Sequence, residues 1–353
     1  MEQISGNGKS KYATIGIRKN IMSLKTKYLG FNLDNPLVPS ASPHSREIDS
    51  AKQLEDAGAP ALVMYSLFEE EIYHEDAELD HYLSHGRDSF SEALSYFPEH
   101  HDISSGPDEY LEQVRQLKEK LDIPIIASLN GVSLGGWIEK AKLIENAGAD
   151  ALELNVYYLP TEPNQSGTEV KNIYIDILKA VKENISIPVA MKIGYAFSAL
   201  PSFAKRIEDA GANALVLFNR FYQPDINLDK LEVEPALSLS DSDEIRLPLR
   251  WIAVLRNQLK LSLGATSGIH TVEDVLKLTM AGADVTFMTS ALLKYGPKHI
   301  TKLKEELVRW MEEHEYESLG QMRGCMSMKN VNDPGAFMRA NYIKTLREYQ
   351  FNS

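Results

Sequence analysis

The chain has 353 residues, with 37 lysines and arginines against 50 aspartates and glutamates, and a formal net charge of -13. This acidic balance argues against a nucleic-acid-binding surface. The single cysteine, Cys325, excludes an intrachain disulfide, and no apolar run of about 18 residues is present that could span a membrane. We therefore expect a cytoplasmic protein with a small-molecule substrate and no nucleic-acid or membrane partner.

The first predicted elements lie near the N-terminus. Residues 1–22 are polar and lack the apolar core of a secretory signal, so they predict a disordered extension; a functional start at Met22 is the alternative. A short hairpin is expected around residues 28–31, where it would plug one mouth of a barrel.

A repeated tripeptide, Ala-Gly-Ala, then ends four amphipathic stretches, each just before an apolar run. Its glycines are Gly58, Gly148, Gly211 and Gly282. Glycine at this place fits the left-handed residue that closes many helices. Each repeat therefore predicts a helix followed by a buried strand.

A second kind of strand alternates with these units. Three of these strands open with Pro36, Pro124 and Pro188, and a fourth lies near Leu261. Proline as the first residue of a strand loses no ladder hydrogen bond. Two strand types in four rounds predict an α/β fold, a (β/α)8 TIM barrel of eight parallel strands.

The barrel is predicted over residues 23–314, followed by a tail, 315–353, that packs on it. The strands are expected to end near residues 42, 66, 130, 155, 192, 219, 266 and 290. The helices are expected over 46–57, 108–121, 134–147, 169–184, from 200, over 247–258, from 271 and over 298–314. Long insertions follow the second and sixth strands, and loops of this length are often lids.

Two loops at the carboxyl ends of the last strands predict a phosphate cup. Thr266-Ser267-Gly268 and Thr289-Ser290 are small residues that allow backbone N–H groups to approach an anion. In TIM barrels the loops after strands seven and eight commonly bind phosphate. Tight turns without a ligand are the alternative explanation.

Three polar residues end the middle strands. Lys192 would be buried, and an unpaired buried ammonium needs an anionic partner. That partner is either a cofactor that becomes negative on reduction or a nearby acid such as Glu153. Asn155 and Asn219 offer both donors and acceptors to a heterocycle, although either could be an ordinary core amide.

The insertion after the second strand carries histidines and acids, including His74, His81, His85 and the run from Glu69 to Glu71. Their spacing matches no familiar zinc pattern. We expect a solvated lid surface and no metal site.

The residues at the strand ends occur in an order that resembles the FMN-binding barrel of the dihydroorotate dehydrogenases. The resemblance is to the soluble class 1 type, in particular the dihydroorotate dehydrogenase-like proteins, and covers residues 24–314. It is carried by Asn35-Pro36-Leu37-Val38, Ala41-Ser42, Asn155, Lys192, Asn219, Ser267-Gly268-Ile269, Thr289-Ser290-Ala291-Leu292 and Gly296-Pro297.

This resemblance implies a layout for FMN. Ser267, Gly268, Thr289 and Ser290 would hold its phosphate, and Lys192 would face the N1/O2 edge of the flavin. Asn155 and Asn219 would contact the ring or the substrate. Ala41, Ser42 and Ser66 would line the ring.

The sequence departs from the family in three places. The substrate loop of the family has no clear counterpart in Ser95-Tyr96-Phe97-Pro98-Glu99. Met64-Tyr65-Ser66 lacks the lysine usually found after strand two. Tyr158 stands where the family has its cysteine or serine base, and a tyrosine with its ordinary pKa near 10 is a poor base at neutral pH. Arg220 could supply the lost positive charge to a carboxylate. Alternatively, the tyrosines only pack the loop and Arg220 pairs with Asp225.

The resemblance implies an FMN-dependent oxidoreductase that oxidises dihydroorotate to orotate in pyrimidine biosynthesis. Lys192, Tyr158 and Asn155 are the candidate catalytic residues, and Asn219 and Arg220 the candidate substrate-binding residues. The alternatives are a flavoprotein with a different substrate and a non-catalytic partner subunit. An electron acceptor is also implied, and a homodimer is compatible with the sequence.

Overall fold

The barrel consists of eight parallel strands whose order in the sheet is β3-β12-β11-β8-β7-β6-β5-β4. The computed structural model describes residues 22–68, 107–131, 134–220, 223–234, 238–338, 342–343 and 346–347. The strands are β3 (Leu37–Pro39), β4 (Leu62–Phe68), β5 (Ile125–Gly131), β6 (Ala151–Val156), β7 (Val189–Ile193), β8 (Ala214–Leu217), β11 (Ser262–Thr266) and β12 (Val285–Met288). Because β3 and β4, the two ends of this order, lie against each other, the sheet is a nearly closed barrel. The predicted TIM barrel is confirmed.

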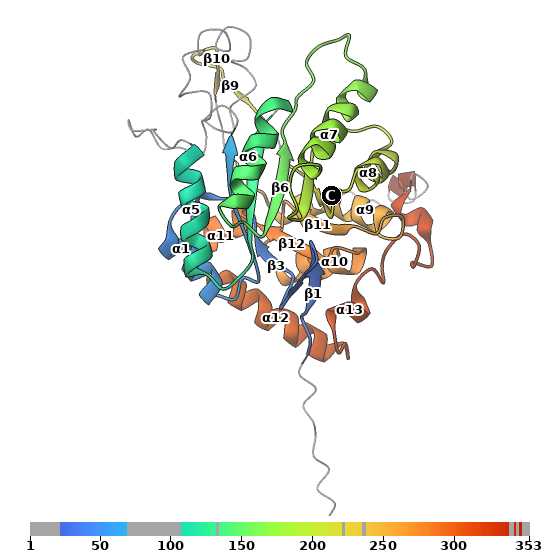
Figure 1. The fold of residues 1–353 in the computed structure, drawn as a ribbon. Coiled ribbons are helices and arrows are strands. Elements are labelled where there is room, and N and C mark those ends of the chain that lie inside the picture. The colour runs from blue at the N-terminus through green and yellow to red at the C-terminus, as the bar shows by residue number, and fades with distance from the viewer. Residues whose placement is uncertain are drawn as a thin grey trace, which may run out of the picture.

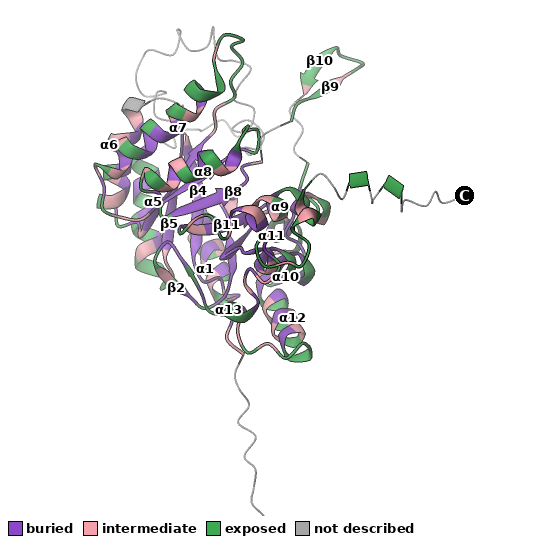
Figure 2. Ribbon diagram, turned by 90° about the vertical axis from the view of Figure 1, so that its right-hand side faces the viewer, coloured by how far each residue is buried: buried purple, intermediate pink, exposed green. Residues whose placement is uncertain are grey.

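Helices surround the barrel with one face buried and one exposed, as the burial colours in Figure 2 show. The main helices are α1 (Ile48–Asp56), α5 (Pro107–Lys120), α6 (Leu134–Asn146), α7 (Gly167–Lys182), α8 (Leu200–Asp209), α9 (Arg246–Leu255), α10 (Val272–Ala281) and α12 (His299–Glu313). The four repeat glycines follow α1, α6, α8 and α10, and all have positive φ, from 97° to 130°. The helix-closing role predicted for the Ala-Gly-Ala repeats is therefore confirmed.

The predicted hairpin is formed by β1 (Thr26–Tyr28) and β2 (Phe31–Leu33), and Figure 1 shows it beneath the barrel. The Tyr28 ring packs edge-on against Phe287 of β12, with centroids 5.6 Å apart. The Thr26 hydroxyl donates to the carbonyl of Asp284, just before β12 begins. The hairpin thus closes the end of the barrel at which the strands start.

Several short elements were not predicted. They are α11 (Ser290–Tyr295), α13 (Leu319–Met322), the hairpin of β9 (Asp225–Asn227) and β10 (Glu232–Glu234), and the 3-10 helices η1 (Pro43–Ser45), η2 (Ser242–Ile245) and η3 (Pro334–Phe337). The predicted helix over 46–57 begins later, at Ile48, because η1 occupies the preceding residues. The β9–β10 hairpin stands away from the barrel in Figures 1 and 2.

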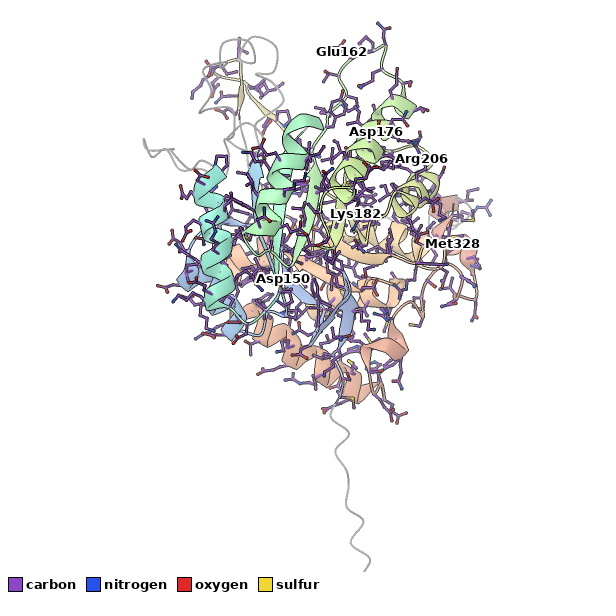
Figure 3. The ribbon with its side chains drawn as sticks, in the orientation of Figure 1. Asp150, Glu162, Asp176, Lys182, Arg206 and Met328 are labelled. Carbon is purple, nitrogen blue, oxygen red and sulfur yellow. The ribbon has the colours of Figure 1, made fainter. Side chains whose placement is uncertain are left out.

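Residues after α12 run along the outside of α10 and α9. The backbone N–H of Met326 donates to Met280 O of α10, and that of Met328 donates to Ala253 O of α9. Figure 3 places Met328 at the side of the barrel near α9. Arg323 forms an ion pair of 2.9 Å with Asp284, whose carboxylate also accepts from Arg256. No helix in the described part of the chain is long and apolar enough to cross a bilayer.

Candidate active site

The inside of the barrel changes from apolar to polar along the strands. On β5 the inward positions read Ile126, Ser128 and Asn130, and on β6 they read Ala151, Glu153 and Asn155. On β7 Ala190 is followed by Lys192. The apolar half lies next to the hairpin, and the polar half lies at the carboxyl ends of the strands. In Figure 3, β6 runs upward from Asp150, just before its first residue, toward the loop that contains Glu162. A polar interior at this end is where TIM barrels carry their chemistry.

Lys192 and Glu153 form an ion pair inside this polar half. The Nζ atom lies 3.5 Å from Glu153 Oε1, and the two side chains are 9% and 1% exposed. The sequence analysis gave Glu153 as the alternative anionic partner of Lys192, and this salt bridge is present. The lysine is buried at the strand end, as predicted.

Asn155 and Asn219 are joined directly. The Asn219 amide donates to Asn155 Oδ1 at 2.6 Å, and both residues are buried. The backbone N–H of Asn219 donates to Ile193 O of β7, so the residue is held at the rim of the barrel. Asn155 lies opposite Lys192 in the β6–β7 register. The structure thus brings the three predicted strand-end residues together.

Asn130 is a site residue that the sequence reasoning missed. It lies opposite Asn155 in the β5–β6 register, it is 4% exposed, and its Nδ2 atom has no hydrogen-bond partner among the described residues. Buried amide groups are nearly always hydrogen-bonded, so an orphan of this kind indicates a group that a ligand can satisfy. Its position two residues after Ser128 on an inward-facing strand was the signal available in the sequence.

The residues predicted to line the flavin ring lie around the same mouth. Ser66 of β4 shares a hydrogen bond of 2.9 Å with Ser128, and both are buried. Ser42 is buried just after β3, and Ala41 is half-buried beside it. The Thr289 hydroxyl donates to Ala41 O at 3.4 Å, which connects the ends of β3 and β12.

The predicted phosphate cup contains two left-handed residues in succession, since Ser267 and Gly268 both have φ of 77°. A Cβ atom on Gly268 would lie 2.6 Å from Asp241 O and 2.8 Å from the backbone nitrogen of Ile245. Glycine is therefore required here by both conformation and space. The Cβ side of Gly268 therefore packs against the segment from Asp241 to Ile245.

Ser240, from the insertion after β8, also belongs to this cup and was not predicted. Its hydroxyl accepts from the backbone N–H of Gly268 at 3.2 Å, and its own N–H donates to Ser290 Oγ at 3.1 Å. The imidazole of His270 lies 3.5 Å from the same hydroxyl. Only the fold brings Ser240 to Gly268, because 28 positions separate them in the chain.

Tyr158 lies in the loop after β6 and packs half-buried against the outer core. Its hydroxyl donates to Gln165 Oε1 at 2.9 Å. The neighbouring helix α7 contributes Tyr174, whose pKa is raised by burial, so that hydroxyl stays protonated. Through these contacts, Tyr158 packs the loop that follows β6.

Arg220, directly after Asn219, pairs with Glu244 at 2.9 Å rather than with Asp225 as the alternative prediction had it. It also donates to Ser238 O. Its side chain is 37% exposed, so the guanidinium stays in reach of solvent. A ligand carboxylate at this place would compete with Glu244 for the same cation.

The histidines and acids of the predicted lid, His74, His81, His85 and the run from Glu69 to Glu71, lie outside the described residues. Within the described ranges there is no group of three or more His, Cys, Asp or Glu side chains able to hold a metal ion.

Comparison with known proteins identifies the family. The family model for dihydroorotate dehydrogenase matches residues 103–311 of the chain, and the chain belongs to this family. The match includes Asn155, Lys192 and Asn219, together with both halves of the phosphate cup.

Individual relatives are distant. One is a putative dihydroorotate dehydrogenase A (fumarate) of Aeropyrum pernix, 26% identical over 61% of this chain and 72% of the relative. Another is the dihydroorotate dehydrogenase B (NAD(+)) catalytic subunit of Shouchella clausii, 27% identical over 61% of this chain and 72% of the relative. The protein of the same name from Methanocaldococcus jannaschii is 25% identical over 82% of this chain and 94% of the relative.

Proposed function

We propose that the protein is an FMN-dependent oxidoreductase that transfers hydride between a small cyclic substrate and the flavin. The observation that carries this proposal is the buried Lys192 at the mouth of the barrel, flanked by Asn155 and Asn219. Family membership and the phosphate cup support it. Bound FMN would supply the chemistry of hydride acceptance and donation at ring atom N5.

The residues present fit such a cofactor. The left-handed turn at Ser267 and Gly268 would hold the phosphate together with Thr289 and Ser290, whose side chains are small. Lys192 would neutralise the negative charge that the ring edge gains on reduction. The unpartnered Nδ2 atom of Asn130 offers a donor to the ring or to the substrate.

Dihydroorotate is the first substrate to consider, because the relatives carry its name. A different substrate of similar size is the second candidate. It is favoured by Tyr158 in the position of the family base and by the absence of a lysine in Met64-Tyr65-Ser66. The third is a flavin-bearing partner subunit without turnover of its own. The relatives are named for different acceptors, fumarate and NAD(+), and the acceptor of this chain is an independent question.

The test is direct. Purified protein should be yellow and release one non-covalent FMN per chain on denaturation, measured by its absorbance spectrum and by mass spectrometry. Candidate substrates, dihydroorotate first, are then added under anaerobic conditions, and the bleaching of the flavin is followed. A flavin that is bound and reduced by substrate supports an enzyme. A bound flavin that no small molecule reduces favours the partner subunit, and a protein that cannot bind FMN refutes the proposal.

A further inference from the structure

The Lys192–Glu153 pair is unusual among the ion pairs of this protein. Among the ion pairs of the described residues, it is the only one in which both side chains are less than 10% exposed. Removing two charges from water is costly, and their attraction offsets that cost only where the geometry is good. At 3.5 Å, the contact between Nζ and Oε1 is longer than the roughly 2.7–2.9 Å of a strong charge-assisted hydrogen bond.

Few other contacts among the described residues compensate for the burial of the Glu153 carboxylate. In the described structure, the hydrogen bond from Lys192 is the one it accepts, although a carboxylate offers about four acceptor sites. Its register neighbour Ser128 is bonded to Ser66 instead. The Tyr28 hydroxyl, from the hairpin below, has no hydrogen-bond partner in the described ranges, and its pKa is raised by burial and then by the charge of Glu153. Among the described residues, Lys192 is the cation that pairs with Glu153.

We propose that Glu153 is a positioning residue that holds Lys192 at the ring edge and, by partly cancelling the charge of the lysine, lowers the reduction potential of the bound flavin. This inference rests on the proposed FMN function. Lys192 alone would favour the negatively charged reduced ring strongly, and a carboxylate behind it weakens that preference. The pair thus sets how readily the flavin passes its electrons on.

The sign of the effect follows from the charges. Glu153→Gln keeps the shape of the side chain but leaves the positive charge of Lys192 uncompensated, so the reduced flavin is stabilised and the midpoint potential rises. Lys192→Met removes the cation and leaves the carboxylate, so the potential falls. We expect each variant to change the ratio of reduced to oxidised flavin at a fixed potential by about tenfold or more, which is about 30 mV for a two-electron couple.

The experiment is an anaerobic redox titration of the FMN-loaded protein against reference dyes. Glu119→Gln is the matched control, because it makes the same chemical change on an exposed position of α5. A Glu153→Gln potential that is lower than that of the control, or equal to it, overturns the proposal.

A second measurement needs no cofactor. Thermal unfolding of the FMN-free protein is compared for Glu153→Gln, Lys192→Met and the double variant, which carries no charge at either position. If the two residues are coupled, the double variant should unfold at a higher temperature than Lys192→Met alone, which buries an unpaired carboxylate. Additive losses would show that Glu153 does not hold Lys192 and would overturn the proposal. A protein that takes up no FMN would refute the proposed function and leave this measurement intact.

Discussion

The side-chain amide of Asn219 donates a hydrogen bond of 2.6 Å to Asn155 Oδ1, which connects the ends of β8 and β6 across the intervening strand that carries Lys192. This bond fixes the orientation of both amides, because one supplies the donor and the other the acceptor. Their remaining polar atoms are thereby available in a defined arrangement at the mouth of the barrel.

Asn219→Ala should weaken FMN binding by about tenfold. The variant removes an amide that would contact the ring and leaves Asn155 without the donor that orients it, and the loss of one hydrogen bond to the ring corresponds to about 1–1.5 kcal/mol. The dissociation constant is measured by the quenching of FMN fluorescence. Asn257→Ala is the control, since Asn257 bonds Ser327 away from the barrel mouth and its substitution should leave the dissociation constant unchanged. Equal affinities in wild type and Asn219→Ala would show that the amide pair does not serve the cofactor.

Gly268→Ala should reduce both FMN occupancy and thermal stability, and Gly268→Asp should abolish binding because it adds a negative charge beside the phosphate. The new Cβ would collide with Asp241 O and the Ile245 nitrogen. Gly296 has the same φ of 77° but no atom within 4 Å of its ideal Cβ, so Gly296→Ala separates backbone strain from the collision. Occupancy is measured as FMN released per chain. Full occupancy in Gly268→Asp would refute the phosphate assignment.

Substitutions of the two partners in the Arg220–Glu244 pair should change the affinity for a carboxylate ligand in opposite directions. If Arg220 anchors a carboxylate of the substrate, Arg220→Ala should weaken binding of a carboxylate ligand such as orotate by tenfold or more. Glu244→Gln should tighten it, because the guanidinium loses its competing partner. Isothermal titration measures both affinities. Unchanged affinity in the two variants would refute the anchor.

Oxidation of dihydroorotate should be slow or absent, well below the typical enzyme turnover of about 10 per second. The hydroxyl of Tyr158 already donates its proton to Gln165. Any turnover that remains should fall by at least about 100-fold in Tyr158→Phe if the tyrosine acts as the base. Tyr195→Phe, at an exposed position after β7, is the control. Rapid turnover that survives Tyr158→Phe would show that a group other than Tyr158 accepts the proton of the substrate.

Two buried tyrosines of equal exposure should respond in opposite directions to loss of the hydroxyl. The hydroxyl of Tyr28 has no partner in the part of the chain that the structure describes, so Tyr28→Phe should stabilise the protein by about 1 kcal/mol. The hydroxyl of Tyr110 donates to Ser128 O and accepts from Ser128 N–H, so Tyr110→Phe should destabilise it by about 2 kcal/mol. Chemical denaturation gives both free energies of unfolding. A loss of stability in Tyr28→Phe would show that its hydroxyl makes a contact with solvent or with Glu153.

The sequence predicted the barrel well because its signals are local. A glycine in the left-handed conformation, as at Gly58 and Gly148, and a proline at the start of a strand mark boundaries within a few residues of chain. The strand-end positions of Lys192, Asn155 and Asn219 followed from those boundaries. Their proximity in space then followed from the barrel.

The parts that could not be predicted depend on contacts between distant segments. Ser240 reaches Gly268, and Glu244 reaches Arg220, only because the insertion folds back over the barrel mouth. In the β9–β10 hairpin, Leu231 has the left-handed conformation, with φ of 56°. Glycine or asparagine at this position would have indicated a turn in the sequence. Asn130 was missed because its inward-facing position alone does not distinguish it from an ordinary core amide, and the unpartnered Nδ2 atom is seen only among the described residues of the fold.

Ser23 and Ser318 are paired in a short parallel bridge, with backbone hydrogen bonds from Ser23 to Glu317 and from Leu319 to Ser23. The segment that enters the barrel and the segment that leaves it are therefore neighbours, on the side where the hairpin closes the strand starts. This bridge holds the start of the hairpin against the residues that follow α12, at the end of the barrel away from the polar strand ends. It also means that a reporter domain attached near Ser23 would sit at the opposite end of the barrel from Lys192, clear of any molecule that enters the mouth.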